Sequence, residues 1–452
     1  MKAVNPATGQ LIRDYPEHDD ARIEEILAQA ETAFVSWRRV PFAERSRLMT
    51  RVADLLRDRA GDYGKLMTEE MGKPIAASEA EIDKCAWVCD FYAEHAERFL
   101  AQEKVITDAT RSFIRYDPLG PVLAIMPWNF PFWQLFRFAA PALMAGNVGL
   151  LKHASNVPGC ALAIEEVFRD AGFPAGAMTT LLVSSEKVKR VIAHPKIRAV
   201  TLTGSEKAGV EVATEAGSCL KKTVLELGGS DPFIVLGDVD PAEAGKQAAK
   251  ARTINSGQSC IAAKRFLVEE SIADRFEEEF VQAMAALEVG DPMDRENDLG
   301  PMAREDLLTA LDDQVQRTVA AGAMLRTGGH RLEGQGYYYA PTVLTGVEPG
   351  MAAFDEETFG PVAAVSRARD ANHAVELANR CSLGLGASIW TADSARGEAL
   401  AAEIQSGSVF VNGMVKSDPR LPFGGIKRSG YGRELSEVGI REFVNIKTVW
   451  VK

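Results

Sequence analysis

The sequence predicts an α/β protein with more than one domain, and its length, composition and spacing of apolar segments support that class. The chain has 452 residues, of which 46% are hydrophobic and 25% charged, as is typical of globular proteins. It is too long for one ordinary core, which favours two or three domains. Short apolar runs alternate with helical segments over residues 122–227. This alternation is expected for a parallel sheet with helices on both faces.

The first hundred residues predict helices. Residues 20–37 carry an apolar stripe with helical spacing, so they form the first predicted helix. Residues 41–59 form the second, which begins at Pro41, where a missing N–H is tolerated. A third is predicted from about residue 78 to residue 100. Residues 112–116 then alternate polar and apolar side chains, which suits a half-exposed strand in a hairpin arm.

The strands of the first parallel sheet are predicted at five apolar runs, which are residues 122–126, 148–152, 179–183, 199–203 and 223–227. No G-x-G-x-x-G motif follows the first of them. Instead, the fourth run leads into Gly204 and Ser205. This serine can cap the next helix, and the helix N-terminus can receive a phosphate. Such a turn, taken alone, is more often an ordinary strand-to-helix connection than a phosphate site.

A second α/β unit follows Gly229. Its predicted strands are residues 233–236, 265–268, 387–390 and 408–412, and its predicted helices are residues 241–251 and 272–287. A cleft between the two units is the natural place for a cofactor and a substrate.

Three short segments carry side chains that suit nucleophilic catalysis. Cys260 ends the glycine-bearing turn at residues 255–260, although a single cysteine is more often a small buried apolar residue. Glu226 ends a predicted strand just before two glycines, and Asn129 lies in a loop at residues 127–131. A thiol nucleophile, a carboxylate base and an amide donor are the components of an acyl-transfer type of mechanism.

These segments, together with residues 202–205, 357–362 and 422–425, resemble those of the aldehyde dehydrogenase superfamily. The similarity extends from residues 5–9 to the last predicted strand, so it covers nearly the whole chain. Within the superfamily, the short length and the segment at residues 152–154 resemble the short bacterial succinate-semialdehyde dehydrogenases that use NAD or NADP.

The resemblance implies a division of the chain into three parts. Residues 1–101 and 118–229 would form a Rossmann-type cofactor domain, and residues 230–432 a second, catalytic α/β domain. Residues 102–117 and 433–452 would form an oligomerisation arm and a C-terminal strand, the latter at residues 443–451. A homodimer or a homotetramer is therefore expected.

The resemblance also implies roles in catalysis. The Cys260 thiolate would attack an aldehyde carbon, and Asn129 with the Cys260 N–H would stabilise the resulting oxyanion. Glu226 would then activate the water that hydrolyses the thioester. A buried structural carboxylate is the alternative for Glu226. Its presence speaks against a CoA-acylating relative, in which a thiol accepts the acyl group.

For the cofactor, NAD or NADP, the resemblance implies contacts from Trp128, Lys152, Ser155, Gly204, Ser205, Glu357 and Phe359. Lys152 would meet the adenosine ribose and Glu357 the nicotinamide ribose. Many NAD-preferring relatives have a glutamate at the position of Ser155. Its replacement by serine removes a charge that would repel a 2′-phosphate, so NADP is permitted. The serine-containing turn at residues 183–186 lacks the glycines common there, so the adenine pocket is expected to differ in shape.

For the substrate, Arg137 stands where succinate-semialdehyde enzymes carry an arginine for the carboxylate tail, and a guanidinium suits a carboxylate. The alternative is a helix arginine paired on the surface. A second arginine of some relatives is Ile254 here, so Ser417 or Arg420 would have to complete the site. The remaining expected substrate contact is Phe423. At the neighbouring position, Phe138 replaces a lysine that many relatives link to proton movement with a glutamate matching Glu434.

Composition limits the other possibilities. A net charge of −12 argues against nucleic acid or an anionic membrane as partner. No signal peptide or membrane span is predicted, so a cytoplasmic location is expected. The six cysteines predict neither a disulfide framework nor a metal site, and Cys85 and Cys89 are expected to pack in the core.

Two alternative functions remain open: a dehydrogenase for another small aliphatic or aromatic aldehyde, and a catalytically silent binding or structural protein of the same family.

Overall fold

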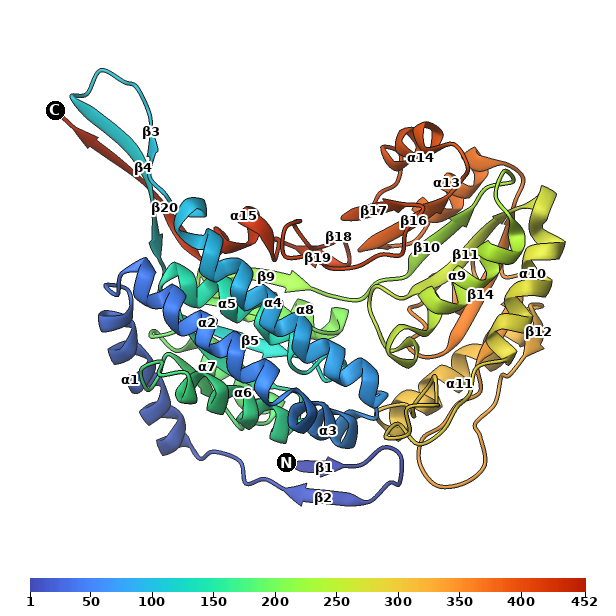
Figure 1. The fold of residues 1–452 in the computed structure, drawn as a ribbon, viewed down its shortest axis with the longest axis horizontal. Helices are drawn as coiled ribbons and strands as arrows, with labels where there is room; N and C mark the ends of the chain where they lie inside the picture. The colour runs from blue at the N-terminus through green and yellow to red at the C-terminus, as the bar shows by residue number, and fades with distance from the viewer.

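The computed structural model describes residues 1–452 and shows two α/β lobes, with a narrow arm projecting from the first (Figure 1). A six-stranded sheet forms the centre of the first lobe and a seven-stranded sheet the centre of the second. Helices pack around both sheets (Figure 1). The predicted α/β class is confirmed. None of the helices combines the length and the hydropathy of a transmembrane span.

The first sheet has the strand order β19-β9-β8-β5-β6-β7. All five predicted runs are strands, and they pair in parallel as β5 (Pro121–Met126), β6 (Val148–His153), β7 (Met178–Thr180), β8 (Ala199–Thr203) and β9 (Lys222–Glu226). The connecting helices are α5 (Trp133–Ala145), α6 (Pro158–Asp170), α7 (Ser185–Ala193) and α8 (Glu206–Ser218). The carboxyl ends of β5, β8 and β9 lie at one edge of the sheet, where ligands bind in open α/β folds.

The N-terminal region contains one helix more than predicted. It comprises a hairpin of β1 (Lys2–Val4) and β2 (Leu11–Asp14), then α1 (Asp20–Trp37), α2 (Phe42–Asp58), α3 (Ala60–Met71) and α4 (Ile75–Phe99). Gly72 ends α3 in the left-handed conformation, at φ 82°. A Cβ at this position would lie 2.8 Å from Cγ of Pro301. The glycine therefore permits both the turn and its close approach to the second lobe.

The second sheet has the strand order β12-β13-β14-β11-β10-β16-β17. Its strands are β10 (Asp231–Val235), β11 (Ala263–Glu269), β12 (Met324–Thr327), β13 (Thr342–Thr345), β14 (Val362–Ala368), β16 (Gly386–Trp390) and β17 (Ser408–Val411). Neighbouring residues of one strand face different cores: Ile234 and Leu267 belong to one apolar cluster, and Phe233 and Phe266 to the other. This is the two-residue alternation of a sheet buried on both faces.

Six helices accompany the second sheet: α9 (Pro241–Thr253), α10 (Glu270–Ala285), α11 (Glu305–Ala320), α12 (Ala352–Asp355), α13 (Ala371–Asn379) and α14 (Ser394–Ala401). Strands β12, β13 and β14 were not predicted. The sequence of β14, VAAVSRA, is rich in alanine, which has a low preference for strands. Parallel pairing with β11 nevertheless holds it in the sheet.

The arm is a three-stranded antiparallel sheet of β3 (Glu103–Lys104), β4 (Arg111–Pro118) and β20 (Val444–Val451). Both predicted arm strands are present, and they pair along their whole length. Before the arm, the chain crosses from the second lobe back to the first. On the way, β18 (Ile426–Lys427) pairs with β15 (Leu383–Gly384), which precedes β16. The chain then forms β19 (Gly430–Tyr431) beside β9, and α15 (Ser436–Ile440). Phe423, Leu435 and Phe443 are buried in the core of the first lobe.

Candidate active site

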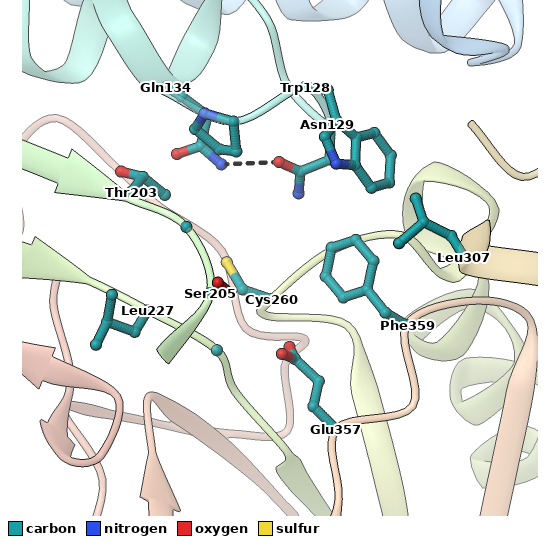
Figure 2. A pocket seen from close by; sticks show the side chains of 13 residues that line it. Trp128, Asn129, Gln134, Thr203, Ser205, Leu227, Cys260, Leu307, Glu357 and Phe359 are labelled. Atoms are coloured by element: carbon teal, nitrogen blue, oxygen red, sulfur yellow. Dashed lines mark hydrogen bonds between the residues drawn. The ribbon is translucent and has the colours of Figure 1, made fainter. Parts of the chain in front are cut away.

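A cavity of about 200 Å³ lies where the strand ends of the first lobe face the second lobe (Figure 2). The first lobe contributes Pro127, Trp128, Asn129, Gln134, Thr203, Gly204, Ser205, Leu227 and Gly228 to its lining, and the second contributes Cys260, Leu307, Glu357 and Phe359. Seven of the residues expected from the sequence are therefore brought together, from segments far apart in the chain. The sulfur of Cys260 points into the space that faces Asn129 and Thr203 (Figure 2).

The loop that carries Cys260 has an unusual backbone. Asn255, Ser256 and Gly257 all have positive φ, at 55°, 54° and 75°. A Cβ at Gly257 would lie 2.3 Å from the carbonyl oxygen of Gly360, so only glycine fits there. Left-handed backbone at a non-glycine residue costs about 1 to 3 kcal/mol and persists where the surroundings enforce it. The strain therefore marks a loop whose shape is fixed by its contacts.

Two fully buried cations hold this loop in place. Lys264 donates through Nζ to the carbonyl oxygens of Ser259 and Cys260, both at 2.8 Å, and lies 3.4 Å from Oε1 of Glu357. Arg252 donates to the carbonyl oxygen of Gly257 at 2.6 Å. Neither cation was among the predicted site residues. In the sequence, Lys264 and Arg252 stand out only as charged residues within apolar segments. The sequence does not reveal which backbone carbonyl groups they bind.

The surroundings of Cys260 favour the neutral thiol over the thiolate. Burial raises its pKa to about 12, although the positive charges of Arg137 and Lys264 act in the opposite direction. The thiolate is the nucleophilic form of cysteine. Attack on a substrate therefore requires a base that accepts the thiol proton.

Asn129 is held beside the cysteine by hydrogen bonds. Its Nδ2 donates to the carbonyl oxygen of Gln258 at 3.1 Å, and its Oδ1 accepts from Nε2 of Gln134 at 3.4 Å, the contact dashed in Figure 2. Its own carbonyl oxygen accepts from Nδ2 of Asn255 at 2.7 Å. An amide nitrogen carries two protons. Asn129 therefore retains one N–H that can donate a hydrogen bond to a bound oxyanion. Gln134, which orients this amide, was not predicted.

Glu226 lies at the end of β9, just before the lining residues Leu227 and Gly228. It is 2% exposed, and neither carboxylate oxygen makes a hydrogen bond of regular geometry. Burial, and then the negative charge of Glu434, raise the pKa of Glu226 to about 8, while Arg137 opposes the shift. A carboxyl group with that pKa can take up and release protons near neutral pH.

Arg137 is buried in the protein, so the surface ion pair considered from the sequence is excluded. Its Nε lies 2.8 Å from Oε2 of Glu434, Nη2 donates to Oε1 of Gln134 at 2.5 Å, and its guanidinium lies 4.6 Å from the ring centroid of Phe423. Phe138 instead packs edge-on against Phe443. The cation that meets Glu434 therefore comes from position 137, and not from position 138.

The two other candidates for substrate binding lie in different environments. Ser417 is buried, and its Oγ accepts from Nζ of Lys84 at 2.8 Å and from Nε1 of Trp133 at 3.1 Å. Arg420 is exposed over 68% of its side chain and pairs with Asp418 at 2.6 Å. Neither residue lines the cavity at Cys260. Lys84 had no predicted role.

A second cavity, of about 550 Å³, lies near the ends of β6 and β7. Its lining includes Lys152 and Ser155, as predicted for a cofactor site, together with Asn156 and Ser184. Both side-chain polar atoms of Asn156 are buried without a partner, and no carboxylate lies within 4.0 Å of the Lys152 ammonium. These unsatisfied groups fit a ligand rich in hydroxyl and phosphate oxygens, such as the adenosine part of NADP.

The predicted nicotinamide side of the cofactor site also has a defined geometry. Glu357 accepts from the N–H of Gly229 at 3.0 Å, and a Cβ at Gly228 would lie 2.4 Å from Glu357 Oε2. Ser205 caps α8, since its Oγ accepts from the N–H of Ala208 at 3.3 Å. Trp128 and Phe359 form an edge-to-face pair with centroids 5.7 Å apart.

Known proteins resemble the chain over its whole length. The profile of the aldehyde dehydrogenase family matches residues 1–449. A Synechocystis protein named probable succinate-semialdehyde dehydrogenase [NADP(+)] is 54% identical over 100% of this chain and 99% of its own. Succinate-semialdehyde dehydrogenase [NADP(+)] 1 of Mycobacterium tuberculosis is 51% identical over 100% of this chain and 99% of its own.

Solved structures agree with the sequence matches. The crystal structure of succinic semialdehyde dehydrogenase from Streptococcus pyogenes, in complex with NADP+ as the cofactor, superposes with a TM-score of 0.97 at 37% identity. That comparison covers 100% of this chain and 99% of the other. With half or more of its residues shared with two full-length relatives, the chain belongs to the aldehyde dehydrogenase family.

Proposed function

We propose that this protein oxidises succinate semialdehyde to succinate with NADP+. One observation carries the proposal: the thiol of Cys260 and the side-chain amide of Asn129 line one cavity, and Glu226, a carboxyl group of raised pKa, directly precedes its lining residues Leu227 and Gly228. The substrate and the preferred cofactor follow from the names of relatives that are more than half identical over their full lengths. The two lobes supply these groups from opposite sides of the cavity.

In the first step, the Cys260 thiol releases its proton to solvent, and the sulfur forms a bond to the aldehyde carbon. The carbonyl oxygen becomes an oxyanion, which the free N–H of Asn129 and the Cys260 backbone N–H stabilise. A bound nicotinamide cofactor would supply the oxidising power by accepting two electrons and the hydrogen of the aldehyde carbon. Glu226 then removes a proton from the water that attacks the thioester, so the acid leaves and the thiol is restored.

The proposal is tested by measuring NADPH and NADH formation with a panel of aldehydes. We expect the highest kcat/KM with succinate semialdehyde and NADP+. A clear preference for an aliphatic or aromatic aldehyde without a carboxylate would replace the proposed substrate. Failure to oxidise any aldehyde, together with measurable NADP+ binding, would favour a catalytically silent member of the family.

Ser155 is the residue for a separate test of cofactor choice. Ser155→Glu should lower kcat/KM for NADP+ roughly fivefold to 150-fold, because a carboxylate would face the 2′-phosphate. This change corresponds to a repulsion of about 1 to 3 kcal/mol. The effect on NAD+ should be smaller. Ser155→Gln is the control, since it adds the same bulk without the charge and should spare NADP+. Equal losses with both cofactors in Ser155→Glu would place Ser155 away from the 2′ position.

We also propose that the protein forms a homo-oligomer through the arm. Ile446 is 62% exposed and Trp450 47% exposed on β20, and Ile106 is 94% exposed at the start of the arm. Large apolar side chains grouped on a projecting element suit burial against another subunit. A dimer and a tetramer are both compatible with this surface, and sedimentation would distinguish them.

We further propose that the protein is located in the cytoplasm. All six cysteines are free, which suits a reducing compartment.

A further inference from the structure

The peptide group that joins Ser259 to Cys260 is bound at its carbonyl and free at its N–H. The carbonyl oxygen of Ser259 accepts from Nζ of Lys264 at 2.8 Å and from the N–H of Ala262 at 3.2 Å, so both of its lone pairs are occupied. The N–H of the same peptide, which belongs to Cys260, makes no hydrogen bond within the protein. In the proposed mechanism this N–H is the backbone donor to the oxyanion.

Lys264 uses all of its donors on the cysteine loop. It lies near the start of β11 and is fully buried. Besides Ser259, its Nζ donates to the carbonyl oxygens of Cys260 at 2.8 Å and of Ala262 at 3.2 Å. An ammonium group has three protons, so these three carbonyls account for all of them. The ammonium therefore has a defined position behind the reactive residue.

Two carboxylates compensate the buried charge of Lys264. Oε1 of Glu357 lies 3.4 Å from Nζ. Burial and the positive charge of Arg252 lower the pKa of the lysine, and the negative charges of Glu357 and Asp231 act against that shift. An ammonium buried without such partners would lose its proton. The two carboxylates thus favour the charged form of Lys264, which polarises a carbonyl group most strongly.

The backbone of Gly229 confines the cysteine from the other side. A Cβ at Gly229 would lie 2.4 Å from the carbonyl oxygen of Cys260. The N–H of Gly229 donates to Glu357, which is also the ion-pair partner of Lys264. The Cys260 carbonyl is therefore enclosed between Gly229 and Lys264, and this enclosure fixes the orientation of the cysteine backbone.

We propose that Lys264 is a positioning residue that strengthens the oxyanion site through the Ser259–Cys260 peptide. A cation bound to the carbonyl of a peptide withdraws electron density from it, which makes the N–H of the same peptide a stronger donor. Such a donor stabilises the negative charge that develops on oxygen when the Cys260 sulfur bonds to a carbonyl carbon. The inference rests on the proposed function and adds to it a residue that acts only through its neighbours.

Two reagents, used without cofactor, separate this role from an effect on the thiol alone. p-Nitrophenyl acetate acylates a thiolate through a tetrahedral oxyanion and releases p-nitrophenolate, whereas iodoacetamide alkylates a thiolate by displacement of iodide, without an oxyanion. The ratio of the two rate constants therefore reports on the oxyanion site. Loss of a positive charge near Cys260 also raises the pKa of its thiol, but this slows both reactions and cancels in the ratio.

Lys264→Met removes the charge and the hydrogen bonds while keeping a side chain of similar length. We expect it to lower the ratio of acylation to alkylation about 10-fold, which is less than the effect of losing a direct oxyanion donor. Lys264→Gln is neutral but still donates hydrogen bonds, so its ratio should lie between those of Lys264→Met and the unmodified protein. It also serves as the test variant if Lys264→Met does not fold. Cys260→Ala supplies the background for both reagents.

Two further variants calibrate the measurement. Asn129→Ala removes a direct donor and should lower the ratio about 10²-fold to 10³-fold. Lys427→Met is the matched control, because Nζ of Lys427 also donates to two backbone carbonyls, those of Asn379 at 3.0 Å and Cys381 at 3.2 Å, and none of these residues lines the cavity at Cys260. Its ratio should equal that of the unmodified protein.

An unchanged ratio in the Lys264 variants, with a lowered ratio in Asn129→Ala, would overturn the role of Lys264 and leave the proposed function intact. An unchanged ratio in Asn129→Ala as well would overturn the oxyanion site, and the role of Lys264 with it. An equal fall of the ratio in Lys427→Met would show that loss of any carbonyl-bound lysine has this effect, which would also overturn the role of Lys264. Failure of the unmodified protein to oxidise any aldehyde would instead overturn the proposed function on which the inference rests.

Discussion

Replacing Cys260 by alanine should abolish aldehyde oxidation, with kcat lowered about 10⁴-fold or more, as for the loss of other covalent nucleophiles. No second thiol lines the cavity, so no other group can form the sulfur–carbon bond. Binding of NADP+ should remain close to that of the unmodified protein, because the polar groups expected to hold the adenosine end lie in the cavity at Lys152. Activity would be followed by NADPH formation and binding by calorimetry.

Cys219→Ala provides the control for this variant. Cys219 follows α8 and is the other cysteine that is not fully buried. Its replacement should leave both turnover and cofactor binding intact. Full turnover by Cys260→Ala would remove the cysteine from the mechanism. Loss of NADP+ binding together with activity would show that the substitution disturbs the loop, whose strained backbone depends on its contacts.

The fold was predictable wherever local sequence patterns determine it. The strands β5 to β9 are continuous apolar runs, and α1 has the apolar stripe of a surface helix, so each was expected within a few residues of its observed bounds. Strand β14 was missed because its alanines favour a helix, and pairing with β11 on one side and β13 on the other holds it extended. The helix α3 was not predicted, and its two internal glycines, Gly61 and Gly64, weaken the local preference for a helix.

The site residues were likewise predictable from local motifs but not from contacts between distant segments. Cys260, Asn129 and Glu357 lie in short motifs, and the structure brings all three to one cavity. Lys84, by contrast, had no predicted role, and its partner Ser417, a predicted substrate contact, lies 333 positions away in the chain. The pairing of Arg137 with Glu434 was likewise invisible, because it depends on which face of α5 the C-terminal segment covers. Long-range contacts of this kind arise from packing, and local spacing does not encode them.

Glu226→Gln should separate the two halves of the reaction. The amide has nearly the shape of the carboxyl but cannot accept a proton from water, so hydrolysis of the thioester should become slow. An acyl-enzyme should then accumulate at Cys260 and be visible by intact mass spectrometry shortly after mixing with aldehyde and NADP+. Steady-state kcat should fall about 10²-fold to 10⁴-fold, the range for loss of a general base. Normal turnover without an acyl-enzyme would exclude Glu226 as the base.

The pH dependence of the same step provides a second test, through Glu434. Glu226 acts as a base only when deprotonated, and its pKa is raised to about 8, so deacylation should accelerate as the pH rises through that value. Glu434→Gln removes the like charge that raises the pKa of Glu226, and it also frees the Arg137 guanidinium from its partner. Both changes favour the ionised form of Glu226. The rising limb of the deacylation rate, measured by stopped flow on preformed acyl-enzyme, should therefore move to lower pH. A limb that stays in place or moves to higher pH would show that Glu434 does not control the ionisation of the base.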